Sequence, residues 1–255
     1  MIVKEFMAEK LKVMAFDTRA AMGSRAGEDA AAYIKALLAQ KETINVMFAA
    51  APSQNEVLEY LKGEDGIDWS RINAYHMDEY VGLDEKHPAG FRNFLKRALF
   101  DYLPFKSVNL INGNAPDANE EAARYGKLLD ENPLDLCVLG IGENGHIAFN
   151  DPPVADFNDK VSVKVVELEQ RCRQQQVNDG CFDAIDQVPT HALSVTIPAL
   201  TRAKKMVCVV PAPTKADAVY HTVNDPVSTA CPATILRTHP DCCLYTDSDS
   251  AAKIL

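Results

Sequence analysis

Leu134-Asp-Leu-Cys-Val-Leu-Gly-Ile141 is a short apolar run that leads directly into the glycine-rich turn Gly140-Ile-Gly-Glu-Asn-Gly-His146. A buried strand that opens into such a turn is typical of a parallel sheet. Similar runs alternate with longer amphipathic stretches along the chain, which predicts an α/β protein with an open, mostly parallel sheet flanked by helices. Ligands bind beyond the carboxyl ends of strands in such sheets, so the residues that follow each strand are the first candidates for chemistry.

The expected elements share one alternating order and cover most of the chain. Strands are predicted at 44–50, 71–77, 108–110, 134–141, 192–197 and 205–210, with further strands at 161–166 and 242–245. Helices are predicted at 20–40, 53–62, 91–102, 119–131 and 214–222. No repeat, low-complexity tract or glycine-serine linker interrupts the pattern, so we expect residues 1–255 to form a single domain.

The amino-acid composition indicates which binding partners and which cellular compartment are expected for this protein. The net charge of −10 disfavours nucleic acid as a partner, because phosphate neutralisation needs a basic surface. The seven cysteines are odd in number and contain no CxxC pair, which favours reduced thiols and a cytoplasmic protein. No apolar run of about 18 residues is present and the first ten residues are broken by charges, so we expect no membrane partner and no signal peptide.

The glycine-rich turn carries the first candidate catalytic group. His146 directly follows Gly145 and lies four residues after Gly142, and Asp151 lies five residues further along. A histidine held by a carboxylate can act as a general acid or base near neutral pH. Glycines at such a place also serve as an ordinary tight turn, so the residue pattern alone leaves both interpretations open.

A second polar segment, His76-Met-Asp-Glu-Tyr-Val-Gly-Leu83, follows the strand predicted at 71–77. Asp78 and Glu79 fit either a solvated strand exit or one wall of a site. Because parallel strands end at the same edge of a sheet, the Asp78 carboxylate and the His146 imidazole are expected to converge on one ligand. His76 is expected to be a buried core histidine.

Taken together, residues 76–83, Gly113-Asn-Ala-Pro116 and Gly140–Pro152 resemble the signature segments of the glucosamine-6-phosphate deaminase (isomerase) family. The resemblance extends from about residue 68 to residue 246. It implies a Rossmann-like fold and the conversion of an aldose 2-amino-6-phosphate into a ketose phosphate plus ammonia. It also implies that the reaction needs no metal and no organic cofactor.

The resemblance implies a role for each residue that matches the family pattern. Asp78 matches the base that moves the C2 proton to C1. His146 resembles the residue that shuttles the proton of the ring oxygen, with Asp151 as its carboxylate partner. Asn144 completes this catalytic group, although some members have aspartate there, and many members have glutamate where Asp151 stands. Glu79, Gly142 and Gly145 are expected to contact the substrate.

The phosphate-binding turn departs from the family. Members usually have Pro-Thr-Gly-Gly-(Thr/Ser)-Pro after the first strand, whereas this chain has Phe48-Ala-Ala-Ala-Pro-Ser-Gln54. An anion could still use Ser53, Gln54 and the start of the following helix. Ser53 and Glu56 also match a helix-capping box, which would give this turn a purely structural role.

Two further segments are expected to complete an anion site. Pro211-Ala-Pro-Thr-Lys215 resembles the second phosphate-binding loop of the family, which makes Thr214 and Lys215 candidates. The family also places an arginine in a later helix, where ungapped alignment puts Gln176 in this chain. Arg171 or Arg173 is expected to substitute. The alternatives are an altered anion site at Gln174, Gln175 and Gln176, and an exposed polar helix face.

Competing functions remain open at this level. A 6-phosphogluconolactonase-like hydrolase shares the Gly-x-x-Gly-His turn but needs no C2 base, and a catalytically silent sugar-phosphate sensor would fit the altered turn. No cysteine or carboxylate residue stands at metal-ligand spacing from the remaining histidines, so no metal site is expected. The subunit number is not set by the sequence, and a homo-oligomer stays open.

Overall fold

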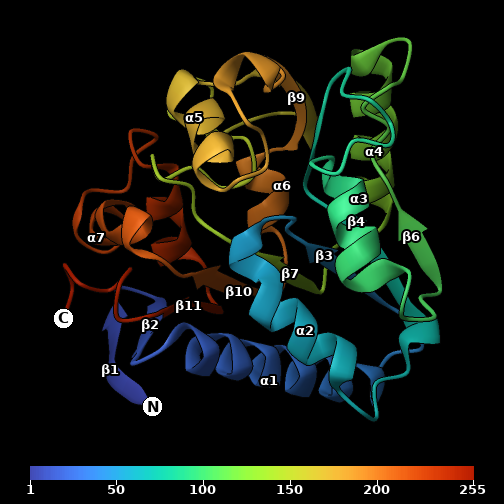
Figure 1. Ribbon diagram of the computed structural model, residues 1–255. Coiled ribbons are helices and arrows are strands. Elements are labelled where there is room, and N and C mark those ends of the chain that lie inside the picture. The colour runs from blue at the N-terminus through green and yellow to red at the C-terminus, as the bar shows by residue number, and fades with distance from the viewer.

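The computed structural model describes residues 1–255 and is built on an eight-stranded sheet with helices on both faces (Figure 1). The strand order is β1-β2-β11-β10-β7-β3-β4-β6, and every pairing is parallel except that of β1 with β2. The predicted α/β fold with a mostly parallel sheet is therefore confirmed. The strands are β1 (Ile2–Ala8), β2 (Leu11–Phe16), β3 (Ile44–Phe48), β4 (Ile72–His76), β6 (Ser107–Asn109), β7 (Leu136–Leu139), β10 (Lys205–Val210) and β11 (Cys242–Thr246).

Both faces of the central strands are buried, which explains their continuous apolar sequences. In β7, Leu136 and Val138 point into a cluster of 38 buried residues, whereas Cys137 and Leu139 point into a second cluster of 33. Helices α1 (Arg19–Leu38), α2 (Asn55–Gly63) and α3 (Phe91–Leu95) cover the first face. Helices α4 (Ala118–Glu131), α6 (Ile197–Thr201) and α7 (Ala216–Asn224) cover the second face.

Side-chain caps fix the starts of the two longest helices. The Thr18 hydroxyl accepts a hydrogen bond from the amide of Ala21, and Asp117 accepts from the first amides of α4. The predicted helices at 20–40 and 119–131 therefore lie within one or two residues of their observed bounds. The predicted helix at 91–102 is α3 followed by a π-helical turn, Lys96–Phe100.

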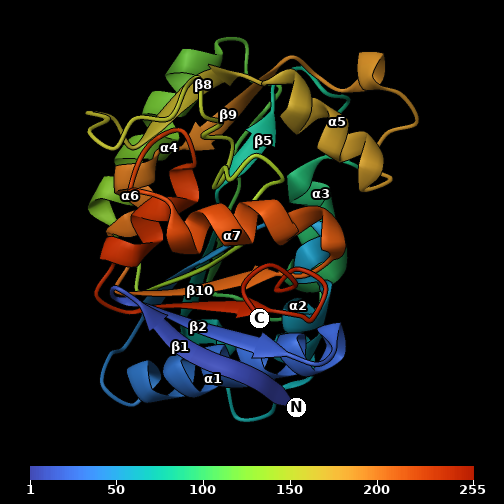
Figure 2. The same cartoon turned by 90° about the vertical axis from the view of Figure 1, so that its left-hand side faces the viewer.

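A second, three-stranded antiparallel sheet corrects one sequence expectation. It joins β5 (Asp78–Tyr80), β9 (His191–Val195) and β8 (Val163–Glu167), and Figure 2 shows it on the far side of α7 from the β1–β2 hairpin. The runs at 192–197 and 161–166 were expected to belong to the main sheet. Their sequence pattern correctly predicts strands, but it does not show which strands they pair with. In the structure β9 pairs with β5 and β8.

Five elements were not predicted: strands β1, β2 and β5 and helices α5 and α6. The β1–β2 hairpin was missed because residues 2–8 carry charges and β1 is an exposed edge strand, although β2 is buried. Helix α5 (Gln170–Asn178) is mostly polar, and its buried residues are only Cys172, Gln175 and Gln176. None of the helices is both long enough and apolar enough to span a membrane.

Candidate active site

A cavity opens at the carboxyl ends of β3, β4, β7 and β10, where the α/β fold predicts a ligand site. The loop after each of β3, β7 and β10 contributes to its wall, and the start of β5 closes one side. Seven of the residues expected in the site line this cavity: Ser53, Gln54, Asp78, Gly142, His146, Thr214 and Lys215. The structure thus brings together expected site residues that are up to 162 positions apart in the chain, as the span from Ser53 to Lys215 shows.

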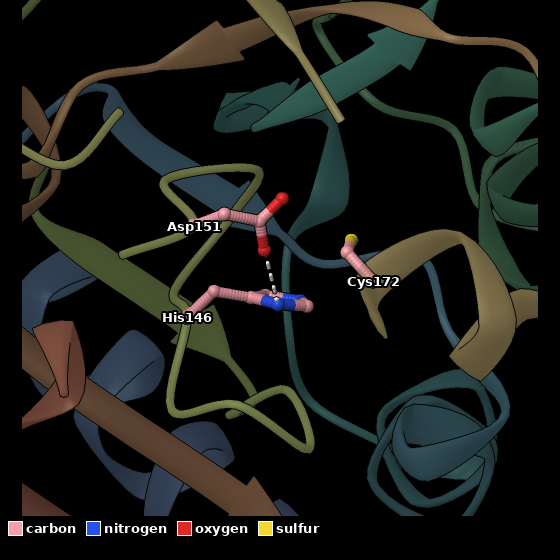
Figure 3. Close-up of side chains that lie close together, drawn as sticks. All are labelled: His146, Asp151 and Cys172. Atoms are coloured by element: carbon pink, nitrogen blue, oxygen red, sulfur yellow. Dashed lines mark ion pairs between the residues drawn. The ribbon is translucent and has the colours of Figure 1, made fainter. Parts of the chain in front are cut away.

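His146 and Asp151 form a direct pair at the base of the cavity (Figure 3). The Nδ1 atom of His146 lies 2.9 Å from Oδ1 of Asp151, so the shorter aspartate reaches the ring without a bridging water. Burial alone would raise the pKa of Asp151, but the charge of His146 and hydrogen bonds from His146, Asn144 and Glu169 outweigh it and lower that pKa. Asp151 is therefore a carboxylate acceptor at neutral pH.

Asn144 acts together with Asp151 to determine which nitrogen of His146 carries the proton. Its Nδ2 donates to Asp151 Oδ1 at 3.0 Å and to Glu169 Oε2 at 2.6 Å, which places its oxygen on the opposite side. That oxygen lies 2.7 Å from His146 Nδ1 and also accepts from the His146 amide. Because Nδ1 faces two oxygen acceptors, it must carry a proton, and the Nε2 atom is left to face the cavity.

Gly142 and Gly145 are required by close approaches. A Cβ atom at Gly142 would lie 2.1–2.3 Å from three atoms of the His146 ring, so the ring can lie over this residue only because it has no side chain. Gly145 has a φ of +83°, and a Cβ there would meet Cys231 Sγ at 2.5 Å. Gly142 lines the cavity, whereas Gly145 shapes the turn behind it.

Asp78 is the buried acid of the cavity. It is 8% exposed and starts β5, where its backbone pairs with that of Ser194. Burial, and secondly the charge of Glu79, raise the pKa of the Asp78 carboxyl well above its ordinary value. A carboxylate with a raised pKa, open to a ligand cavity, is suited to proton abstraction.

Lys215 supplies a buried positive charge on the opposite wall. It is 5% exposed, lines the cavity, and has no carboxylate within 4 Å and no hydrogen-bond acceptor in the protein. Burial lowers its pKa, while the charges of Asp179 and Glu143 act in the opposite direction. A buried ammonium without a partner favours an anionic ligand in contact with it.

A family model described as glucosamine-6-phosphate isomerases/6-phosphogluconolactonase matches residues 17–244. The chain belongs to this family. A glucosamine-6-phosphate deaminase of Exiguobacterium sp. is 39% identical over 190 residues, which cover 74% of this chain and 73% of the relative. A glucosamine-6-phosphate deaminase of Bacillus cytotoxicus is 40% identical over 184 residues, covering 72% and 68% respectively.

Superposition on solved structures shows that the chain also shares its fold with members of this family. A monomeric glucosamine-6-phosphate deaminase superposes with a TM-score of 0.85 at 27% identity, covering 94% of this chain and 98% of that one. The 6-phosphogluconolactonase from Thermotoga maritima superposes with a TM-score of 0.74 at 18% identity, covering 92% and 98%. The second likeness concerns the fold alone.

All six residues of the turn that departs from the family, Ala49–Gln54, line the cavity. Gln54 is fully buried, and its Nε2 donates to Ser53 Oγ and to the carbonyl of Val209. Its Oε1 atom is buried and has no partner. Since Ser53 Oγ already accepts from Gln54, its hydroxyl proton is free to donate to a ligand.

The capping box expected from Ser53 and Glu56 does not form. Helix α2 begins at Asn55, one residue after Gln54, and it has no side-chain cap. Glu56 instead pairs with Arg19, whose Nε lies 2.6 Å from Glu56 Oε1. This contact comes from the start of α1, so a local spacing rule could not detect it.

Besides Gly145, two expected substrate contacts lie outside the cavity. Glu79 does not line the cavity, because both of its oxygens accept amide hydrogens from Tyr80, Phe91 and Arg92 and so hold the start of α3. Arg171 is exposed, donates to the carbonyl of Glu143, and faces a neighbouring hollow together with Asn144. Gln175 and Gln176 of α5 line the cavity instead.

Sequence reasoning missed three residues around the site. Arg19 lines the cavity, Glu169 accepts a hydrogen bond from Asn144, and Cys172 lies near the His146–Asp151 pair (Figure 3). Donor atoms of Cys172, His146 and Asp151 lie within 4.8 Å of one another. Because Nδ1 of His146 holds a proton toward its oxygen partners, its lone pair is not available to a metal there. No spacing in the sequence marks Arg19 or Glu169.

Proposed function

We propose that this chain is a glucosamine-6-phosphate deaminase. The reaction is an aldose-ketose isomerisation with hydrolytic release of ammonia, and it gives fructose 6-phosphate. The observation that carries the proposal is the placement of Asp78, His146 and Lys215 around one cavity. A base, a proton shuttle and a cation for the phosphate are the three groups that this reaction needs.

His146 is proposed to open the sugar ring. Its Nε2 faces the cavity as an acceptor, because Nδ1 is held by Asn144 and Asp151. Nε2 takes the proton of the C1 hydroxyl and passes it to the ring oxygen as the bond between C1 and that oxygen breaks. Ring opening turns C1 into an aldehyde, which makes the C2 proton acidic.

Asp78 is proposed to move that C2 proton to C1. Its carboxylate removes the proton from C2 to give an enol-type intermediate, and its carboxylic acid returns the proton to C1. The C2 amine then becomes a ketimine, and attack by water releases ammonia and leaves the ketone. The burial that raises the pKa of Asp78 makes it a stronger base than an exposed aspartate.

The 6-phosphate is proposed to bind at the Lys215 end of the cavity. Lys215 and Thr214 follow β10, and Ser53 presents a free hydroxyl proton from the turn after β3. The seven cysteines are all unpaired, which supports a reducing compartment, so we place the enzyme in the cytoplasm.

Ammonia release from 2-amino-sugar 6-phosphates and from their unphosphorylated forms tests the proposal. We expect glucosamine 6-phosphate to yield equal amounts of ammonia and fructose 6-phosphate. Binding without turnover would favour a sugar-phosphate sensor. Hydrolysis of a 6-phosphogluconolactone without ammonia release from any amino sugar would favour a lactonase and refute the proposal.

A further inference from the structure

Glu169 lies outside the cavity and has no role in the mechanism above, yet it contacts the catalytic group. It precedes α5, and its Oε2 atom accepts a hydrogen bond of 2.6 Å from Asn144 Nδ2. Its backbone amide donates to Asp151 Oδ2 at 3.2 Å. One residue therefore touches both side chains that hold His146.

The side chain of Glu169 has no other task in the structure. It makes no capping hydrogen bond to the start of α5, although it occupies the capping position. It forms no ion pair, since no lysine, arginine or histidine nitrogen lies within 4 Å of its oxygens. Its one side-chain partner is the Asn144 amide, so its effect must pass through that amide.

The Asn144 amide has two N–H bonds, and a carboxylate receives each of them. Together the two carboxylates prevent the amide from turning over, because a turned amide would place its oxygen against both negative charges. The observed orientation keeps the Asn144 oxygen 2.7 Å from His146 Nδ1. A turned amide would present N–H to that nitrogen and leave Asp151 Oδ1, at 2.9 Å, as its only oxygen acceptor, which would weaken the preference for the Nδ1-protonated tautomer.

We propose that Glu169 is a positioning residue that keeps His146 protonated at Nδ1 by fixing the orientation of Asn144. The catalytic part of this inference rests on the proposed function, whereas the tautomer does not. The tautomer decides the chemistry, because only a ring protonated at Nδ1 presents a free Nε2 to the substrate.

Two variants of matched length separate the hydrogen bond from the bulk of the side chain. Glu169→Gln keeps an acceptor oxygen at the same reach, whereas Glu169→Met removes it; Glu169→Ala serves as a second deletion. Glu167→Met is the control, because Glu167 is exposed and has no side-chain partner. Thermal denaturation verifies that each protein is folded.

The tautomer is read from the ring nitrogens of His146 by long-range nitrogen-15 NMR, with the signal assigned through His146→Gln. We expect the Nδ1-protonated form in the parent, in Glu169→Gln and in the control, and a mixture of tautomers in Glu169→Met and Glu169→Ala. For ammonia release we expect Glu169→Met and Glu169→Ala to lose about 10–100-fold in kcat, with KM within about twofold of the parent. Losses of this size are typical when a residue that orients a functional histidine is removed.

An unchanged tautomer in both Glu169→Met and Glu169→Ala would overturn the proposal. Equal loss in Glu169→Gln and Glu169→Met would still support the proposal and would assign the effect to the negative charge of Glu169, which repels the oxygen of a turned amide. If the parent releases no ammonia, the proposed function fails, yet the tautomer measurement still decides the role of Glu169.

Discussion

Asp78 is the residue on which the proposed chemistry depends. Asp78→Asn keeps the size of the side chain and removes the base, so we expect kcat to fall by about 10²–10⁴-fold. Binding of an unreactive sugar-alcohol phosphate, measured by calorimetry, should stay within a few-fold of the parent. Near-normal turnover in this variant would exclude Asp78 as the base.

The pH profile offers a second test of Asp78. The base works only when deprotonated, so activity rises with pH as Asp78 loses its proton. Because burial raises its pKa, the acid limb of kcat/KM should lie well above the ordinary aspartate range near 4. An acid limb at about pH 4 would show that the base that removes the C2 proton is a solvent-exposed carboxylate and not the buried Asp78.

His146 acts at an earlier step in the same cavity. His146→Gln keeps a polar side chain over Gly142 but cannot shuttle the ring-oxygen proton. We expect a larger loss of activity on a substrate fixed in its cyclic form than on one supplied as the open chain. Rapid-mixing measurements with both forms make the comparison, and equal losses would count against a role in ring opening.

At the scale of elements, Glu79 links β5 to α3. Its two oxygens accept three backbone amide hydrogens, and they satisfy two donors at the start of a five-residue helix that has no side-chain cap of its own. Glu79→Gln replaces one acceptor by a donor and leaves a buried amide unsatisfied. We expect a loss of about 1–3 kcal/mol in the free energy of unfolding.

Chemical denaturation with urea measures this loss, and exposed Glu167→Gln is the matched control. A stability equal to that of the control would mean that Glu79 is not needed to hold α3. Its side chain would then be free for another task.

The connection between β10 and α7 carries the charge that the phosphate needs. Lys215→Ala should weaken the apparent affinity for substrate about tenfold to a hundredfold, the cost of one charge-assisted contact. Inorganic phosphate should compete with substrate in the parent and much less in this variant. Lys127→Ala, on an exposed face of α4, is the control. Unchanged affinity without phosphate competition would indicate that the pocket takes an unphosphorylated amino sugar.

At the scale of the whole molecule, the two sheets share their hydrophobic clusters. Val138 of the main sheet and Val166 of the small sheet lie in one cluster, and Cys137 and Leu193 lie in the other. We therefore propose that residues 1–255 fold as a single domain. Far-UV circular dichroism and the fluorescence of Trp69, the single tryptophan, should report one coincident unfolding transition. Two separated transitions would contradict this proposal.

The sequence by itself determined the main sheet and the centre of the site. Strands such as β7 are buried on both faces, so their apolar runs are continuous and readable without any knowledge of the neighbours. The turn Gly140–His146 is also local, because Gly142 is required by a ring only four residues away. Those segments follow strands of one parallel sheet, so their convergence was predictable as well.

Only the tertiary structure decided the contacts between distant segments. Asp78 proved to start a strand of the small sheet beside Ser194, and Glu79 proved to accept hydrogen bonds from backbone amides outside the cavity. Arg19 pairs with Glu56 across 37 residues, and Asn144 reaches Glu169 across 25. A polar side chain carries no periodic signal for such a partner, because the partner is chosen by the packing of the elements that bear the two groups.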